Sequence, residues 1–288
     1  MRLGLVQMRS GRSLDQNVEA AATFISDAAS QGARYVQTPE MTTLVERDRK
    51  RLAAEITADA CARAADRFSQ LAARHKTWLH IGSMAVPVAD GRFANRAHLF
   101  APDGRLSATY DKIHMFDVDL DNGESWRESA IYAPGDSSVV ASLTDGSEEV
   151  QVGLGICYDL RFAALFRQQA QAGADLLTMP AAFTRQTGEA HWHVLLRARA
   201  IETGSYVAAA AQGGLHEDGR ETYGHSLVID PWGSVVGEKA DDEPGVLFAD
   251  IDVGQVAAAR QKIPALQHDR AFEVTSASEK TDSDRAVA

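Results

Sequence analysis

The sequence predicts an α/β protein whose mixed β-sheets pack face to face, with helices on the outside. Segments with strand-like and helix-like patterns alternate along the 288 residues, which is the order expected of α/β folds. Two tight turns, APDG at 101–104 and DPWG at 230–233, each lie between predicted strands. Such hairpins pair their strands antiparallel, so the sheets are expected to be mixed rather than purely parallel.

The N-terminal half begins with a strand and continues with a helix that has one apolar face. Apolar residues of this helix recur every three or four positions, namely Leu14, Val18, Ala22, Ile25 and Ala29. Residues 47–75 also show a helical pattern, in one or two pieces. Strands are predicted at residues 2–8, 33–38, 78–84 and 96–100, and in a returning segment that ends at 110–112.

The C-terminal half continues this alternation and ends in a polar tail. Strands are predicted at 150–156, 175–179, 206–211 and 225–229, with helices at 162–174 and 190–202. Residues 275–288, TSASEKTDSDRAVA, are mostly small and polar, which predicts disorder. No linker or internal repeat divides the rest, so residues 1–274 are expected to form one domain.

Composition argues against several classes of protein. The 29 basic and 40 acidic residues give a formal net charge of −11, which argues against nucleic-acid binding through Lys and Arg. No run of about 20 apolar residues occurs and the N-terminus lacks a signal-peptide pattern, so neither membrane insertion nor secretion is expected. Cys61 and Cys157 are too few for a disulfide framework or a zinc cage, which favours a reducing, cytoplasmic location.

Three residues with catalytic chemistry each lie at the end of a predicted strand. Glu40 ends TPEM, Lys112 closes the strand before IHMFD, and Cys157 follows GLGI. Taken alone, each has an ordinary alternative: a turn carboxylate, a surface lysine and a small buried side chain. The last alternative also describes Cys61 on its helical stripe. Loops at the carboxyl ends of strands are where active sites of α/β folds gather.

Together the three side chains would supply what amide hydrolysis requires. The reaction needs a nucleophile, a group that carries the proton of the nucleophile, and donors for the developing oxyanion. A strand-to-helix elbow would expose Cys157, and a nearby helix N-terminus or cation would favour its thiolate. Glu40 would move the proton, while Lys112 and a backbone N–H would stabilise the oxyanion. This chemistry needs neither a metal ion nor a cofactor.

Three sequence blocks around these residues, TPEM, YDKIHMFDVD and GLGICYDLRF, resemble the signature blocks of the nitrilase (carbon–nitrogen hydrolase) superfamily in order and spacing. The resemblance extends from residue 2 to about residue 272. It implies a four-layer α-β-β-α sandwich, usually dimeric, in which Glu40, Lys112 and Cys157 hydrolyse amides through a cysteine thioester. It also implies that Glu128, in WRESAIYAPGD, holds the lysine and orients the substrate, and that the Tyr158 N–H serves the oxyanion.

The segment PAAFTRQTGEAHWHVLLRARAIETG, with YGHSLVIDPWG, is similar to the Nit-type amidases, and most of all to deaminated glutathione amidases. This similarity implies a small-molecule amide substrate that carries a 2-oxo carboxylate, with release of ammonia. Arg161 would bind the carboxylate as a bidentate fork, and Phe183 and Thr187 would line the pocket. The alternative for Arg161 is an ion pair with Asp159 or another acid.

Other functions compatible with these residues stay open. The ω-amidases that act on 2-oxoglutaramate, the N-carbamoyl-amino acid hydrolases and the nitrilases share the triad, so the triad does not separate them. A cysteine–histidine hydrolase would use His191, His193, His216 or His225 as its base. A metal site at His191 and His193 is disfavoured, because residues two apart do not share a helical face. Outside enzymes, the alternative is a binding protein that has lost catalysis.

Overall fold

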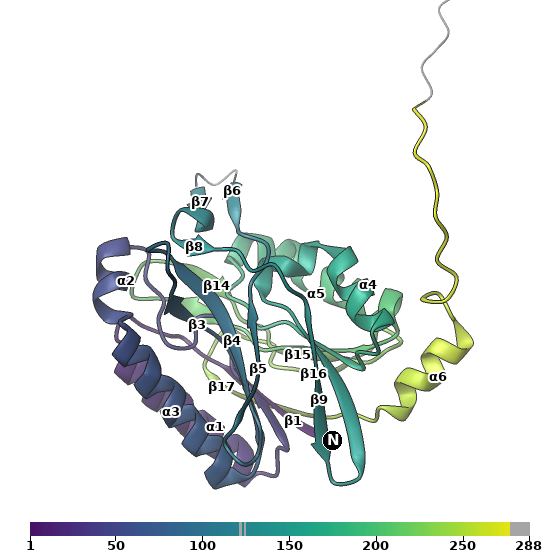
Figure 1. The fold of residues 1–288 in the computed structure, drawn as a ribbon, viewed down its shortest axis with the longest axis horizontal. Helices are drawn as coiled ribbons and strands as arrows, with labels where there is room; N and C mark the ends of the chain where they lie inside the picture. Colours follow the sequence, from purple (N-terminus) through teal and green to yellow (C-terminus); the bar gives the residue numbers. More distant parts are fainter. Residues whose placement is uncertain (121–122, 124, 277–288) are drawn as a thin grey trace, which may run out of the picture.

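The computed structural model describes residues 1–120, 123 and 125–276. Within these residues, two large β-sheets lie at the centre and helices cover their outer faces (Figure 1). The first sheet has the strand order β17 (Gly245–Asp250), β1 (Arg2–Gln7), β2 (Tyr35–Gln37), β3 (Trp78–Pro87), β4 (Phe93–Phe100) and β5 (Leu106–Asp111), with β8 (Tyr132–Ala133) paired to β4. The second has the order β16 (Val235–Glu238), β15 (Leu227–Ile229), β12 (Tyr206–Ala209), β11 (Leu176–Thr178), β10 (Glu148–Leu154) and β9 (Val139–Asp145).

Parallel strands occupy the middle of each sheet and antiparallel strands its edges. β1, β2 and β3 are parallel neighbours, as are β10, β11 and β12. β4 and β5 pair antiparallel, and so do β15 and β16, which confirms the mixed sheets predicted from the two turns. Because β5 and β3 both run antiparallel to β4, β5 points in the same direction as β2. The carboxyl ends of β2 and β5 therefore lie at one edge of the first sheet.

Helices form the outer layers. Figure 1 shows α1 (Leu14–Ser30) and α3 (Ala58–His75) against the first sheet, and α4 (Ala163–Gln171) and α5 (Arg185–Thr203) against the second. α2 (Arg49–Glu55) precedes α3, and α6 (Gly254–Lys262) follows the last strand. Ser13 and Thr57 begin α1 and α3 by accepting hydrogen bonds from backbone N–H groups of the first turn. The four-layer α-β-β-α sandwich implied by the sequence is thus confirmed.

The strands alternate their side chains between two layers of core. In β1, Leu3 and Leu5 pack between the sheets with Leu154 of β10, whereas Val6 packs under the helices with Ile25 of α1. This period of two is what a strand buried on both faces requires. Full burial of a side chain of this size contributes about 1.5–3 kcal/mol. The apolar layers therefore provide a rigid base for the polar residues at the strand ends.

Several predicted boundaries differ from the observed ones. The helix expected at 190–202 already begins at Arg185, because its polar first turn does not show the apolar period. The helical pattern at 47–75 is confirmed as two pieces, which separate at Ile56 and Thr57.

Other predicted segments were missed or shortened. Strands that were not predicted include β9, β17 and the short pairs β6 (Asp117–Asp119) with β7 (Ser125–Arg127) and β13 (Gly213–Leu215) with β14 (Glu221–Tyr223). Most of the tail predicted at 275–288 lies outside the described residues. None of the described helices combines the length and apolar character that a bilayer crossing requires.

Gly82 of β3 is tightly enclosed by the segments that follow β2 and β11, and we expect its replacement by alanine to destabilise the fold. A Cβ at this position would lie 2.6 Å from the Pro39 carbonyl oxygen, and nearer still to the Thr38 carbonyl oxygen and to Pro180 Cβ. Such overpacking costs about 1–3 kcal/mol. Urea denaturation followed by circular dichroism should show the loss for Gly82→Ala.

The matched control is Gly237→Ala in β16, where the nearest atom to a new Cβ is Ala249 Cβ at 3.3 Å. This variant is expected to unfold at nearly the wild-type urea concentration. Equal midpoints for the two variants would contradict the close approach at Gly82.

Candidate active site

The carboxyl ends of three strands meet around one cavity. Glu40 lies beyond the end of β2, Lys112 directly follows β5, and Cys157 lies beyond the end of β10. A cavity of about 370 Å³ is lined by all three side chains and by Glu128. The structure thus brings together side chains from both sheets that the sequence singled out one by one.

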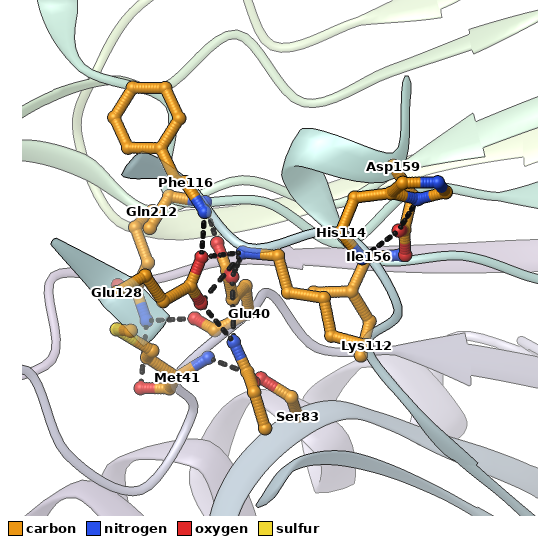
Figure 2. A network of polar contacts seen from close by, with 12 residues as sticks. Glu40, Met41, Ser83, Lys112, His114, Phe116, Glu128, Ile156, Asp159 and Gln212 are labelled. Carbon is orange, nitrogen blue, oxygen red and sulfur yellow. Dashed lines mark hydrogen bonds and ion pairs between the residues drawn. The ribbon is translucent and has the colours of Figure 1, made fainter. Parts of the chain in front are cut away.

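Lys112 is buried between two carboxylates (Figure 2). Its Nζ lies 2.9 Å from Glu40 Oε1 and 2.8 Å from each carboxylate oxygen of Glu128. Asn95 Nδ2 donates to Glu40 Oε1 at 2.9 Å and to Glu128 Oε1 at 3.3 Å. The side chains of Lys112 and Glu40 are 2% and 3% exposed. Charges so far from solvent are stable only when they are paired and hydrogen-bonded in this way.

Contacts from both sheets hold Glu40 in place. Its Oε2 accepts a hydrogen bond from the Ala182 N–H at 2.9 Å, in the segment after β11. Gln212 Nε2 donates to the Glu40 carbonyl oxygen at 3.0 Å, and the Met41 N–H donates to Ser83 Oγ at 2.9 Å (Figure 2). Met41 has a φ of 55°, in the left-handed region, so the chain turns sharply after Glu40. These contacts fix the Glu40 carboxylate against Lys112.

Cys157 occupies a strained turn at the start of a 3-10 helix, Cys157–Arg161. Its φ is 50°, a region that non-glycine residues seldom adopt, and its N–H donates to the Pro180 carbonyl oxygen at 2.9 Å. Strain of this kind is often found at functional sites. The helix expected to open near Phe162 is preceded by this 3-10 turn. Within the described residues the Tyr158 N–H donates to no other group, so it is free to bind a ligand oxygen.

Asp159 ties the Cys157 turn to the strand that carries Lys112. Its carboxylate accepts hydrogen bonds from the Ile156 N–H at 2.9 Å and the Tyr110 hydroxyl at 2.7 Å. It also accepts from the backbone N–H of His114 at 3.1 Å and from His114 Nδ1 at 2.7 Å (Figure 2). The side chain of Asp159 is fully buried. Its oxygens are therefore committed to positioning these two segments.

The buried charges determine which groups are protonated. Burial alone would raise the pKa of Glu40, but the charge of Lys112 and hydrogen bonds from Cys157, Lys112 and Ala182 lower this pKa below the usual 4.5. Burial and the charge of Glu40 raise the pKa of Cys157 well above the usual 9.0. Burial opposes the charge of Lys112, yet the two carboxylates raise its pKa well above 10.5. The resting site therefore holds a carboxylate, an ammonium and a neutral thiol. The Lys112 cation lowers the pKa of the Cys157 thiol, as a cation was expected to do, but burial and the charge of Glu40 outweigh it.

The family model described as carbon–nitrogen hydrolase matches residues 2–261. The chain belongs to the carbon–nitrogen hydrolase family. It is 40% identical over 266 residues to a deaminated glutathione amidase of Synechocystis sp., covering 91% of this chain and 96% of that protein. It is 37% identical over 286 residues to the omega-amidase NIT2 of Mus musculus, covering 97% and 98%. The solved structure of the C. elegans NitFhit protein matches with a TM-score of 0.86 at 34% identity, over 93% of this chain and 65% of that one.

Membership establishes the class of reaction. This hydrolase acts on carbon–nitrogen bonds other than peptide bonds, and its superfamily hydrolyses amides with a cysteine. The three sequence blocks that suggested the family lie at the cavity, because Glu40, Lys112 and Cys157 all line it.

Of the residues expected to bind substrate or the oxyanion, some line the cavity and one does not. Phe183, Thr187 and Tyr158 line the cavity. Arg161 is not among the lining residues; its Nη2 lies 3.3 Å from His191 Nδ1, and its guanidinium carbon lies 5.7 Å from the Phe183 ring centroid. Asp159, the ion-pair partner considered for Arg161, instead contacts His114, and no other ion pair of Arg161 is found among the described residues. Arg161 is thus a cation beside the cavity-lining Phe183, without a carboxylate partner among the described residues.

None of the four histidines considered as an alternative base lines the cavity in the described part of the chain. His216 bonds Ser10 and Thr222, and His191 contacts Arg161. His193 and His225 both contact Glu238, with their ligand-type atoms within 4.8 Å of one another. The side chains that shift the pKa of Cys157 are Glu40 and Lys112, not a histidine. The geometry therefore disfavours a cysteine–histidine pair.

The sequence did not reveal several residues of the site. Asn95, Asp159 and Gln212 are buried polar side chains whose partners are distant in the chain. Asn95 did not stand out in FANRAHLF, because this segment also contains Arg96 and His98. Arg47 and Arg220 on the cavity wall had no sign at all, because both lie in irregular loops.

Asp159→Asn is expected to reduce the stability and the activity of the hydrolase together. The amide keeps one acceptor oxygen but presents an N–H₂ group towards donors, so at least one buried hydrogen bond is lost at a cost of about 1–3 kcal/mol. Urea denaturation and kcat would measure the two effects. Tyr110→Phe removes one donor and leaves the carboxylate, so both losses should be smaller. A Tyr110→Phe variant as impaired as Asp159→Asn would contradict the central role of Asp159.

Proposed function

We propose that this hydrolase is a cysteine amidase in which Cys157 is the nucleophile, Glu40 the proton-transfer base, and Lys112 with the Tyr158 N–H the oxyanion site. The observation that carries the proposal is the buried Glu40 carboxylate, which contacts the Lys112 ammonium at 2.9 Å and lines the same cavity as the Cys157 thiol. A base with a lowered pKa beside a thiol with a raised pKa can receive the proton only as the attack proceeds.

The reaction follows from these protonation states. Glu40 takes the thiol proton as Cys157 Sγ bonds to the amide carbon, and the carbonyl electrons move to oxygen. Lys112 and the Tyr158 N–H stabilise that oxyanion. The oxyanion then collapses, the carbon–nitrogen bond breaks, and Glu40 returns its proton to the leaving nitrogen. Water deprotonated by Glu40 attacks the thioester, which releases the carboxylate and restores the thiol.

Glu128 is proposed to hold Lys112 rather than to take a proton. Both of its oxygens contact the ammonium, and Oε2 also accepts the Phe116 N–H at 2.7 Å. These bonds fix the side of Lys112 that does not face Glu40. Asn95 bridges the two carboxylates and keeps their spacing. The ammonium is thereby held in a fixed position before the substrate arrives.

We propose an amide of a 2-oxo acid as substrate, with deaminated glutathione first and 2-oxoglutaramate, the ω-amidase substrate, second. The relatives named for these activities are 40% and 37% identical to the chain. Arg161, lacking an ionic partner in the described residues, is proposed to bind the 2-oxo carboxylate beside Phe183 and Thr187. The leaving group differs between the substrates. The amide nitrogen of deaminated glutathione belongs to its cysteine, so cysteinylglycine leaves rather than ammonia, which only primary amides release.

A homodimer and a cytoplasmic location complete the proposal. The outer face of α5 exposes Val194 and Ile201, which are 68% and 56% exposed. Trp232 is 58% exposed and precedes Gly233, whose carbonyl oxygen accepts a hydrogen bond from Arg197 of α5. Large apolar side chains on one face are suited to contact between subunits. Cys61 and Cys157 are both free thiols, and a thiol nucleophile keeps its activity in a reducing compartment.

Glu40→Gln is expected to lower kcat by about 10²–10⁴, because the amide cannot accept the thiol proton. The variant keeps the size and most hydrogen bonds of Glu40, so the fold should remain. Release of 2-oxoglutarate from either substrate reports the rate, and intact-mass spectrometry detects acyl-enzyme.

Cys157→Ala sets the inactive baseline. Cys61→Ala, whose thiol donates to the Ala85 carbonyl oxygen in another part of the fold, should be fully active. A Glu40→Gln enzyme with wild-type turnover would eliminate Glu40 as the base.

The pH dependence should separate a glutamate base from a histidine base. Glu40 must be ionised and its pKa lies below 4.5, so kcat/KM should stay level from about pH 6 to 8 and fall only as the pH drops through that pKa. A histidine base with an ordinary pKa of about 6.5 would place the acid limb close to neutrality. Rates with 2-oxoglutaramate across this range would decide, and an acid limb near neutrality would favour the cysteine–histidine mechanism.

A further inference from the structure

The cavity has a second charged wall that the proposed mechanism does not use. Arg47 and Arg220 both line the cavity, and each guanidinium carbon lies 4.6 Å from the ring centroid of Trp126. Arg47 belongs to the loop between β2 and α2, Arg220 directly precedes β14, and Trp126 belongs to β7. Three segments that are distant in sequence therefore bring two cations to one aromatic ring.

Among the described residues these two cations share one carboxylate. Asp218 Oδ2 lies 3.8 Å from Arg47 Nε and 3.7 Å from Arg220 Nη2, which are ion-pair distances but too long for hydrogen bonds. Both Asp218 Oδ2 and Arg220 Nε are buried without a hydrogen-bond partner. Glu46 also lines the cavity, but it is paired with Arg12 at 3.0 Å. Counted over the residues that the structure describes, this wall of the cavity thus carries more positive than negative charge.

Arg220 is the more constrained of the two arginines. It is 8% exposed, and its Nη1 contacts the Met41 thioether sulfur at 3.3 Å, which is a weak acceptor. A buried guanidinium that lacks good acceptors carries an unfavourable free energy, which a ligand oxygen would relieve. A carboxylate suits the guanidinium best because the two groups form bidentate hydrogen bonds. Arg127, which also lines the cavity, is instead held by both oxygens of Asp119 at 2.9 Å.

Neighbouring charges indicate which part of a substrate this wall would bind. At the catalytic end, Glu40 and Glu128 flank a single cation, so a second substrate carboxylate would be repelled there. Arg220 contacts Met41, the residue after Glu40, and Glu40 is the group proposed to return a proton to the leaving nitrogen. The 2-oxo carboxylate of the acyl group is already assigned to Arg161. An anion at Arg47 and Arg220 would therefore belong to the leaving group.

We propose that Arg47 and Arg220 bind a carboxylate at the far end of the leaving group. The proposal rests on the proposed function and narrows the substrate class to secondary amides of 2-oxo acids whose amine ends in a carboxylate. Deaminated glutathione belongs to this class, and its cysteinylglycine part spans about 7 Å when extended. The cavity of about 370 Å³ is spacious for a five-carbon primary amide but falls within the range of roughly 300–1,000 Å³ for larger ligands. With 2-oxoglutaramate, whose leaving group is ammonia, the two arginines have no anion to bind.

The test compares deaminated glutathione with its C-terminal glycinamide, which differs only in the leaving-group carboxylate. Release of 2-oxoglutarate gives kcat/KM for both and for 2-oxoglutaramate. The wild-type enzyme should prefer the free carboxylate by roughly ten- to a hundredfold, mainly through KM, as expected for hydrogen bonds to a charged group. Arg220→Gln and Arg47→Gln should each bring this ratio towards one. Arg220→Lys should keep part of it, and the matched control Arg127→Gln should keep all of it.

Each outcome bears on the proposal. A wild-type enzyme that hydrolyses 2-oxoglutaramate but treats the acid and its amide alike keeps the amidase function and overturns the carboxylate site. A loss that is equal for all three substrates also overturns it, because the arginines would then serve the common acyl group or the fold. Should Arg220→Gln fail to fold, Arg47→Gln decides, since its side chain is 44% exposed. No turnover of any substrate would overturn both the function and the site.

Discussion

The rest of the site depends on the burial of one ammonium group between two carboxylates. Removing charges from water costs several kcal/mol for each ion, and the attraction among Lys112, Glu40 and Glu128 offsets this cost only at close distances with every polar atom paired. Asn95 and the N–H groups of Phe116 and Ala182 complete that pairing. Loss of the Lys112 ammonium would leave two buried carboxylates uncompensated. The network therefore constrains the chain around it as strongly as the apolar core does.

That constraint joins the two sheets. Glu40 extends from the first sheet and accepts the Ala182 N–H from the second. The Cys157 turn follows β10 of the second sheet, and Asp159 anchors it to Tyr110 of the first. Gly82, which has no Cβ, lies against Thr38 and Pro39 after β2 of the first sheet and against Pro180 after β11 of the second. Amidase chemistry needs groups placed to a fraction of an ångström, and strand ends of two rigid sheets provide that placement better than a single flexible loop.

Much of this arrangement could be predicted from the sequence, because it depends on patterns within short segments of the chain. The parallel strands β2 and β10 are largely buried, so their ends could be located, and Glu40 and Cys157 lie beyond those ends. Lys112 instead follows the antiparallel edge strand β5, which the APDG turn made recognisable as a returning strand. Short strands such as β6 and β7 are largely exposed and show no clear alternation, so they were missed. Asp159 could not be recognised, because its partner Tyr110 is 49 positions away. The same applies to Gln212 and Glu40, which are 172 positions apart. Contacts of this kind exist only once the sheets have packed.

The net charge of the buried cluster explains why a neutral thiol suits this site better than a resting thiolate. With Cys157 protonated, the cluster of Glu40, Glu128 and Lys112 carries one net negative charge. A thiolate beside both carboxylates would add a second negative charge in a region that excludes water, and the raised pKa of Cys157 reflects that penalty. Transfer of the proton to Glu40 keeps the total unchanged while negative charge moves through sulfur to the substrate oxygen, next to Lys112. The electrostatic stabilisation thus becomes available only as the carbon–sulfur bond forms, which favours the transition state over the resting enzyme.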